Sequence, residues 1–404
     1  MSSRTSQRRL PPAWLLPWGA FAAIVVTWLL DVAGPGVPEP LARAVLIVGL
    51  AALLGAAGRA VLGSVRRRGV TGWALLAVTA LSLGMKLSTL DFELTTHARN
   101  DEGVYREFAE KINEGELLPR YFNYGHLLYY AGALSLWAGE QFPETSALAA
   151  EGLYGARTPL EVRRVLLRLI TALLAALTVI PVFLAAERLG GPWAGVVGGL
   201  LLAASTVHNE VAPQFTADGP SGFFAALAFL YVVKLVEGER LADYLAAGAL
   251  AGLAAACKYP GGVVTVGIFG VWLFWRVRLR RFSWSLVWAA AACVGALLVV
   301  MPALWLTPGA VLDPSQTDGR DLFFGVRQYA FGGWLGVEPE SVTLWNLRVL
   351  RADLGWPAIL FGIGGWFLLD PDRRRRLLVA LVFPAAYLAL LFAMNMVVRR
   401  NLLP

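Results

Sequence analysis

The chain has 404 residues, of which 57% are hydrophobic and 16% are charged, and its formal net charge is +7. Soluble domains carry about 25% charged residues, so this composition leaves too little polar surface to cover a soluble globule. The apolar residues form long blocks instead of short alternating runs, which favours helices over a barrel as the membrane-spanning structure. We therefore expect an all-α polytopic membrane protein. Its basic residues lie mostly between apolar blocks, where they orient the chain, so no nucleic-acid partner is expected.

About eleven transmembrane helices are predicted from the apolar blocks, because about 20 apolar residues are needed to cross the hydrocarbon core. The predicted spans are residues 14–31, 41–62, 72–90, 165–186, 190–206, 219–236, 243–257, 260–275, 284–306, 354–369 and 377–398. A further apolar segment, 127–138, is short for a span and is expected to be re-entrant or interfacial.

The short basic loops all fall on one side of these predicted spans. They are the N-terminus, Arg66–Arg68, Arg276–Arg281 and Arg373–Arg376. The positive-inside rule then predicts a cytoplasmic N-terminus, with residues 91–164, 205–218 and 307–353 outside. Polar residues concentrated in outer loops are typical of an enzyme whose active site faces outward. Arg- and Ala-rich usage, with Arg well above Lys, is typical of a GC-rich bacterial genome, so the expected location is the bacterial inner (cytoplasmic) membrane.

The first outer segment carries the acidic pair Asp101 and Glu102. An amphipathic stretch follows at Tyr105–Glu114, and its helical spacing predicts a juxtamembrane helix. The pair either caps that helix, where the helix dipole favours negative charge, or carries out chemistry. The segment continues through Gly115–Pro119 to an aromatic return, Tyr124–Tyr130.

These motifs together resemble the first outer loop of C-type (GT-C) glycosyltransferases, in the group of protein O-mannosyltransferases and lipid A aminoarabinose transferases (glycosyltransferase family 39-like). The resemblance implies a GT-C-like bundle in which Asp101 is the catalytic base, or lies beside it, with Glu102 as its neighbour. Tyr105 and Tyr124 are expected to bind substrate. His126, also assigned to substrate binding, departs from the proline usual in the family.

Residues 168–188 resemble a span of the same family. Arg163, Arg164 and Arg168 lie at its outer end, against the positive-inside trend. They either snorkel to lipid headgroups or contact the phosphate of the lipid-phosphate sugar donor that the resemblance implies, since Arg suits bidentate phosphate binding. We assign Arg168 to the phosphate.

The outer loop 205–218 resembles a family loop that ends in an aspartate. Its His208 and Asp218 are assigned to substrate binding, although Asp218 also suits a helix cap. A divalent metal bound by His208 and Glu210 is left open. One histidine without cysteine in this loop argues against a dedicated metal site, so no cofactor is predicted with certainty.

Two more motifs supply cations. Lys258, followed by Tyr259, lies between apolar spans, where an ionisable residue is either functional or an interfacial anchor. The resemblance implies that Lys258 holds the lipid-linked phosphate, with Tyr259 in the substrate site. Near the end of the chain, Arg399 and Arg400 resemble an outer motif in which an Arg meets the donor phosphate.

The resemblance implies transfer of a sugar from a polyprenyl-phosphate donor to a hydroxyl of a lipid, glycan or protein acceptor. One carboxylate base and a phosphate leaving group imply inversion, and no nucleotide-binding loop is present. The alternative is a transporter or flippase for a lipid-linked glycan, which would place charges mid-span. Residues 1–71 are expected to form a cytoplasmic tail and two additional helices. Residues 72–404 are expected to form the catalytic domain, truncated at its C-terminus.

Overall fold

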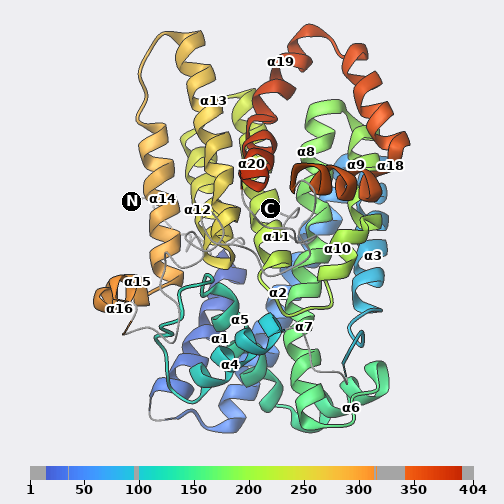
Figure 1. Ribbon diagram of the computed structural model, residues 1–404. Coiled ribbons are helices and arrows are strands. Elements are labelled where there is room, and N and C mark those ends of the chain that lie inside the picture. Colours follow the sequence, from blue (N-terminus) through green and yellow to red (C-terminus); the bar gives the residue numbers. More distant parts are fainter. Residues whose placement is uncertain (1–14, 35, 95–99, 314, 316–341, 394–404) are drawn as a thin grey trace, which may run out of the picture.

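The computed structural model describes residues 15–34, 36–94, 100–313, 315 and 342–393, and the described residues form helices without any strand (Figure 1). The expected all-α class is thereby confirmed. Five helical stretches are long and apolar enough to cross a membrane: Glu39–Arg68, Val70–Leu87, Pro159–Gly190, Asp218–Glu237 and Tyr259–Leu279. Shorter apolar helices occupy Gly19–Ala33, Pro192–Ala204, Leu241–Cys257, Ser285–Val300 and Ala358–Phe367.

The helices follow the predicted spans in chain order. They are α1 (Leu15–Ala33), α2 (Glu39–Arg68), α3 (Val70–Leu87), α7 (Pro159–Leu177), α8 (Val179–Gly190), α9 (Pro192–Ala204), α11 (Asp218–Glu237), α12 (Leu241–Cys257), η1 (Tyr259–Val263), α13 (Val264–Leu279), α14 (Ser285–Val300), α18 (Val342–Leu368), α19 (Pro371–Ala380) and α20 (Val382–Ala393). Short helices α10 (Thr206–Val211), α15 (Ala303–Leu306) and α16 (Pro308–Leu312) lie in the connections. Eleven crossings therefore remain a prediction, because several of these helices are shorter than a span.

One predicted boundary coincides with a break inside α18. Gly355 has φ 74° and ψ 153° within the helix, a conformation that suits glycine because it has no Cβ. The predicted span at 354–369 thus corresponds to the part of α18 that follows this break.

Three helices of residues 91–164, the segment expected to lie outside, gather at the lower end of Figure 1: α4 (Asn100–Asn113), α5 (Leu127–Glu140) and α6 (Pro143–Tyr154). We call them the outer lobe. A helix occurs where the juxtamembrane helix was expected, but it begins at Asn100 instead of Tyr105. Asp101 and Glu102 lie inside its first turn, where two carboxylates oppose the partial positive charge of the helix end.

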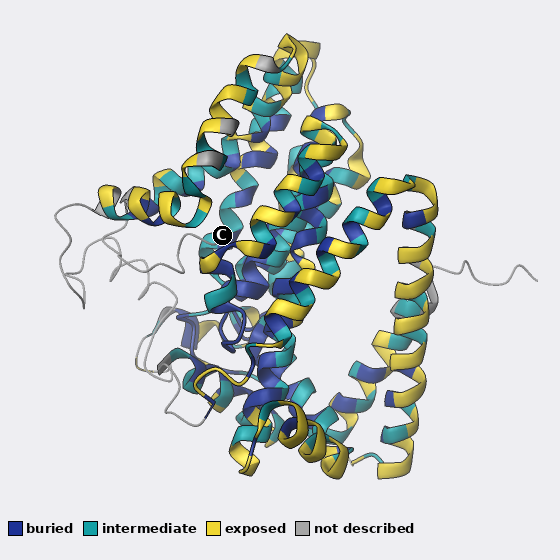
Figure 2. Cartoon of the chain, turned by 90° about the vertical axis from the view of Figure 1, so that its right-hand side faces the viewer, coloured by how far each residue is buried: buried dark blue, intermediate teal, exposed yellow. Residues whose placement is uncertain are grey.

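The N-terminal hairpin packs onto the outer lobe. The indole of Trp28 on α1 donates to the Asn113 side chain at 3.1 Å, and the indole of Trp137 on α5 donates to Asp31 at 2.7 Å. Ile24, Trp28, Ala42 and Leu46 share one buried cluster with residues of α4 and α5. Figure 2 shows dense burial where the outer lobe meets the bundle and exposed faces along the long helices. Many of the exposed side chains on these helices are large and apolar. Helices α1 and α2 thus support the layer that carries Asp101.

The pair α12 and α14 is held together by small residues. A Cβ added to Gly248 would overlap the carbonyl oxygen of Ala289, and one added to Gly252 would overlap that of Cys293. Glycines spaced by four residues let two helix backbones approach closely in a membrane. This contact sets the position of the C-terminal end of α12, where Lys258 follows.

We expect Gly248→Ala to lower stability by about 1–3 kcal/mol, the usual cost of overpacking a tight contact. Gly295→Ala is the matched control, because Gly295 lies on α14 with no atom within 4 Å of its added Cβ. The control should be neutral or gain up to about 1 kcal/mol from helix propensity. Thermal unfolding of the purified variants in detergent measures the difference, and equal melting temperatures would contradict the close packing.

Candidate functional site

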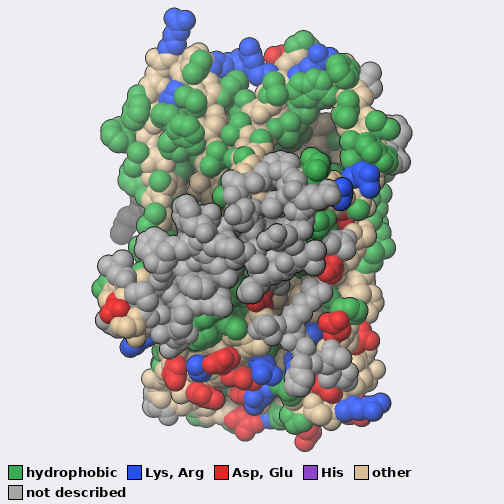
Figure 3. Space-filling model, in the orientation of Figure 1, with side chains coloured by type: hydrophobic (Ala, Val, Ile, Leu, Met, Phe, Trp, Pro, Cys, Tyr) green, Lys and Arg blue, Asp and Glu red, His purple; other side chains and the backbone are tan. Residues whose placement is uncertain are grey.

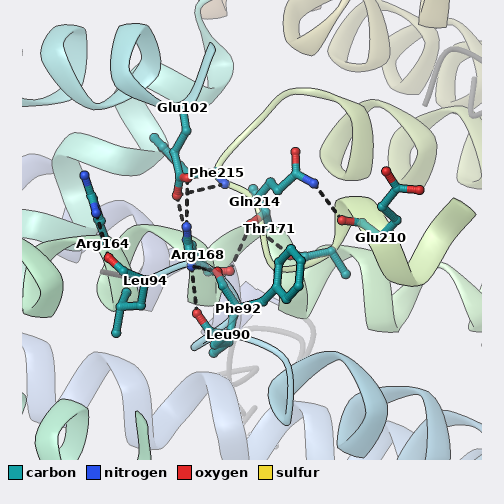
Figure 4. Close-up of polar contacts among 11 residues, drawn as sticks. Leu90, Phe92, Leu94, Glu102, Arg164, Arg168, Thr171, Glu210, Gln214 and Phe215 are labelled. Carbon is teal, nitrogen blue, oxygen red and sulfur yellow. Dashed lines mark hydrogen bonds and ion pairs between the residues drawn. The ribbon is translucent and has the colours of Figure 1, made fainter. Parts of the chain in front are cut away.

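A buried ion pair fixes the first turn of α4 to α7. The Nε and one Nη of Arg168 lie 2.6 and 2.9 Å from the two carboxylate oxygens of Glu102, and the two residues are 2% and 4% exposed. The same guanidinium donates to the carbonyls of Leu90 and Phe92 at 2.9 and 2.8 Å (Figure 4). A buried charge is costly without partners. This arrangement therefore holds α4, α7 and the segment that follows α3 together.

The loop before α11 joins the same ion pair. The backbone N–H of Phe215 points at Glu102 across 3.5 Å, and the hydroxyl of Thr171, one turn after Arg168, donates to the Ala212 carbonyl across 3.4 Å (Figure 4). These long contacts place residues 212–215 beside α7. The chain reaches Asp218 at the start of α11 three residues later.

Asp101 lies next to Glu102 but has a different environment. Its side chain accepts a hydrogen bond from the phenol of Tyr124 at 3.2 Å, and the residue is only partly buried. The ring of Tyr124 packs 5.0 Å from that of Tyr105, which is buried and lies 5.5 Å from Tyr129. Packing of these three rings therefore fixes the Tyr124 phenol that donates to the Asp101 carboxylate.

Lys258 follows the last residue of α12 in an extended conformation, with φ −148° and ψ 122°. Its ammonium lies 2.5 Å from a carboxylate oxygen of Asp218, the first residue of α11. The Asp218 side chain is 5% exposed and that of Lys258 is 18% exposed. The hydroxyl of Thr216 donates to the other oxygen of Asp218 at 3.3 Å. Two of the predicted site residues thus form one cation–carboxylate pair.

Residues 122–125 connect Asp101 with the segment that carries Lys258. The phenol of Tyr259 donates to the carbonyls of Phe122 and Tyr124 at 2.7 and 3.3 Å, and the Gly125 N–H donates to the Cys257 carbonyl at 3.2 Å. A Cβ on Gly125 would overlap the Ala256 carbonyl oxygen. Tyr124 therefore contacts Asp101 through its side chain while its backbone rests on the segment that carries Lys258.

His126 belongs to the same segment and is buried. Its ring is fully buried between Phe122 and Tyr129, with centroids 5.3 and 5.4 Å away, and its Nε2 lies 3.3 Å from the Tyr121 carbonyl. Burial lowers the pKa of the imidazole to about 4, although the Tyr121 contact acts in the opposite direction. A neutral ring that replaces the expected proline therefore packs inside the aromatic return. Its contact with substrate stays a prediction.

His208 belongs to a second polar cluster. Its backbone N–H is capped by the Ser205 hydroxyl at 3.1 Å, and burial, followed by the nearby Lys86 charge, lowers the pKa of its imidazole to about 3. Lys86 on α3 is fully buried and donates to the Asn209 side chain at 2.8 Å. Asp353 accepts from the Ser205 hydroxyl at 2.7 Å. Lys86 was not predicted, although a lysine inside an apolar span is a recognisable signal.

Two further expectations can be placed. No group of three or more His, Cys, Asp or Glu side chains capable of holding a metal occurs within the part of the chain that the structure describes, so the open question of a metal at His208 and Glu210 gains no support there. Arg399 and Arg400 lie outside the described residues.

Two comparisons with known proteins found similar proteins. The model of the family "Dolichyl-phosphate-mannose-protein mannosyltransferase" matches residues 160–306. ArnT from Cupriavidus metallidurans, solved with bound undecaprenyl phosphate, superposes with a TM-score of 0.57 at 20% identity, over 83% of this chain and 58% of that chain. The Archaeoglobus fulgidus oligosaccharyltransferase gives a TM-score of 0.43 at 18% identity, over 76% and 38%. No curated protein matches.

The matched segment contains Arg168, His208, Asp218, Lys258 and Tyr259. The chain spans less than two thirds of the length of ArnT, with which it shares its fold. The resemblance stated from the sequence is confirmed: residues 160–306 match the model of the dolichyl-phosphate-mannose-protein mannosyltransferase family, and the chain shares the fold of ArnT.

Proposed function

We propose that the chain is a membrane glycosyltransferase that moves a sugar from a polyprenyl-phosphate donor to a hydroxyl of a lipid, glycan or protein acceptor. The observation that carries the proposal is the joining of Asp101 and Lys258 through one short segment. Tyr124 bonds Asp101 with its phenol, and its carbonyl accepts from Tyr259, the residue after Lys258. A carboxylate and an ammonium group held in one frame are the two charges that this transfer needs.

In the proposed reaction, Asp101 takes the proton of the acceptor hydroxyl as that oxygen attacks the anomeric carbon. The bond from this carbon to the donor phosphate breaks, and its electron pair leaves with the phosphate. Lys258 stabilises the departing charge. Direct displacement by one attacking oxygen inverts the configuration at the anomeric carbon. The Tyr124 phenol orients the Asp101 carboxylate for this step.

Lys258 must meet the phosphate while it is paired with Asp218. An ammonium group has three N–H donors, so it can bond Asp218 and a phosphate oxygen together. We propose that Asp218 holds Lys258 in place when the donor is absent and orients it when the donor is bound. Arg399 and Arg400 remain proposed as further contacts of the donor phosphate.

Arg168 was expected to bind that phosphate, and its environment supports a different role. Four of its five N–H groups already bond Glu102, Leu90 and Phe92, and the side chain is 2% exposed. We therefore propose Arg168 and Glu102 as positioning residues. They hold the first turn of α4, and so Asp101, against the bundle.

The location proposed for the chain is a bacterial inner membrane, with the outer lobe facing outward. This orientation puts Arg66–Arg68, Arg276–Arg281 and Arg373–Arg376 on the cytoplasmic side, as the positive-inside rule requires. The site would then meet a donor presented at the outer leaflet.

Replacing Asp101 by Asn removes the base and keeps the shape of the side chain. We expect the rate of sugar transfer from a polyprenyl-phosphate hexose or pentose to fall by about 10²–10⁴-fold, the usual contribution of general base catalysis. Sugar release by the purified protein in detergent measures it, with each candidate donor radiolabelled in the sugar.

Glu107→Gln provides the matched control for this test. Glu107 lies on the same helix, 58% exposed and paired only with Lys111 among the described residues, so its loss should leave the rate within about twofold of the wild type. Equal rates for Asp101→Asn and Glu107→Gln would remove Asp101 from the chemistry.

Replacing Lys258 by Met removes the ammonium that would meet the phosphate. Hydrogen bonds to charged groups contribute about 1.5–3 kcal/mol, so we expect the KM for the donor to rise about 10–100-fold. Lys258→Met also leaves the buried Asp218 carboxylate unpaired, which is destabilising in itself. Measurements on Lys258→Met with Asp218→Asn separate the two effects. If the double variant binds the donor as the wild type does, Lys258 has no role at the phosphate.

The alternative function is a transporter or flippase for a lipid-linked glycan. The same assay distinguishes it, because a transporter moves the donor across a proteoliposome membrane without releasing its sugar. Sugar release that depends on Asp101 would exclude this alternative as the sole activity.

A further inference from the structure

The turn between α13 and α14, residues 276–284, is a second charged feature of the molecule. It lies at the end of the bundle opposite the outer lobe, at the top of Figure 1. Four arginines fall within six residues, and three of them, Arg278, Arg280 and Arg281, are exposed. Figure 3 shows Lys and Arg side chains along this end, whereas many acidic side chains gather at the other end.

The turn is held in one shape by contacts of its own. Arg276 is paired with Glu239 and also donates to the Arg281 carbonyl at 2.7 Å. The indole of Trp272 donates to the Ser283 carbonyl at 3.0 Å. Arg280 adopts the left-handed conformation, with φ 51°, which reverses the chain at the end of α13. The exposed arginines are thus displayed on a fixed turn.

The three exposed guanidinium groups have no acidic partner among the described residues. Arg278 is exposed and lies over the Trp275 ring at 5.7 Å. Unpaired arginines next to one another repel, so an anionic ligand that bonds them would relieve that repulsion. Arginine is also the side chain best suited to phosphate, because its fork of donors matches two phosphate oxygens.

Exposed aromatic rings surround these arginines. Phe282, Trp284 and Trp288 are 66%, 65% and 56% exposed. Phe282 stands edge-on to Trp272 and Trp284, with centroids 6.1 and 5.1 Å apart. Amphipathic aromatic rings concentrate at the level of lipid headgroups. Rings of this kind beside the three arginines favour a lipid headgroup over a soluble anion as their ligand.

We propose that the α13–α14 turn is a binding site for the phosphate of anionic phospholipids in the leaflet opposite the outer lobe. Arg278, Arg280 and Arg281 bind the headgroup, while Phe282 and Trp284 contact the adjoining acyl region. The site is independent of the proposed sugar transfer and of the residues that carry it. Attraction of basic segments to anionic leaflets is a general electrostatic effect, and here it is focused on one ordered turn.

A second basic segment of the chain provides the control. The run Arg373–Arg376 at the start of α19 contains as many arginines, but acidic residues stand beside it. Arg373 is paired with Asp370 at 3.2 Å, and Arg374 donates to the Phe367 carbonyl at 2.7 Å. If anionic lipids were attracted only by general positive charge, both segments would bind them equally well. A specific site predicts that binding depends on the α13–α14 turn.

The test measures thermal unfolding of the full chain in detergent as phosphatidylglycerol or phosphatidylcholine is added. We expect phosphatidylglycerol to raise the melting temperature of the wild type and phosphatidylcholine to leave it unchanged. The triple variant R278Q/R280Q/R281Q should need at least tenfold more phosphatidylglycerol for the same shift. The control R374Q/R375Q/R376Q should respond like the wild type, and native mass spectrometry should count fewer retained anionic lipids in the first variant alone.

Other outcomes overturn the proposal. Equal responses of the two triple variants would mean that only general charge attracts the lipid. A wild-type shift reproduced by inorganic phosphate at the same concentration would assign the arginines to a free anion. If the Gln variant does not fold, R278K/R280K/R281K keeps the charge and should retain most of the shift. Failure of that folded, charge-preserving variant to respond would contradict binding of the headgroup at this turn.

Discussion

The buried ion pair between Glu102 and Arg168 is the constraint on which the arrangement of the site depends. A carboxylate and a guanidinium removed from water are tolerable only when their hydrogen bonds are satisfied, and here backbone groups from Leu90, Phe92 and Phe215 complete the set. Those groups come from the end of the α3 connection and from the loop before α11. One ion pair therefore links four segments of the chain, and Asp101 takes its position from it.

The second half of the site follows from close backbone packing. Gly125 lies against the end of α12 where no Cβ fits, and Tyr259 bonds the carbonyls on either side of Asn123. The tight contact of α12 with α14 at Gly248 and Gly252 fixes the position of the C-terminal end of α12. The proposed base and the proposed phosphate contact are thereby held by rigid elements, which suits a reaction that needs both charges at fixed positions.

Much of this organisation could be predicted from the sequence, and the remainder shows what one sequence leaves open. Long apolar blocks predicted the helices, and the resemblance to a family predicted Asp101 and Lys258 as site residues. The start of α4 was misplaced by five residues, because the apolar periodicity begins at Val104 while the polar first turn continues the helix back to Asn100. The partner of Arg168 lies 66 positions away, so its burial with Glu102 depends on tertiary packing that periodicity does not report. His126 was interpreted from a motif, whereas its burial follows from the rings stacked on either side of it.

The anomeric configuration of the transferred sugar tests the central claim most directly. Single-turnover transfer from a polyprenyl-phosphate sugar of known configuration can be followed by NMR of the product, together with the released lipid phosphate. Direct displacement with Asp101 as the base and Lys258 at the leaving phosphate predicts an inverted product and one lipid phosphate for each sugar transferred. Retention of configuration, or release of the sugar still attached to phosphate, would contradict the account.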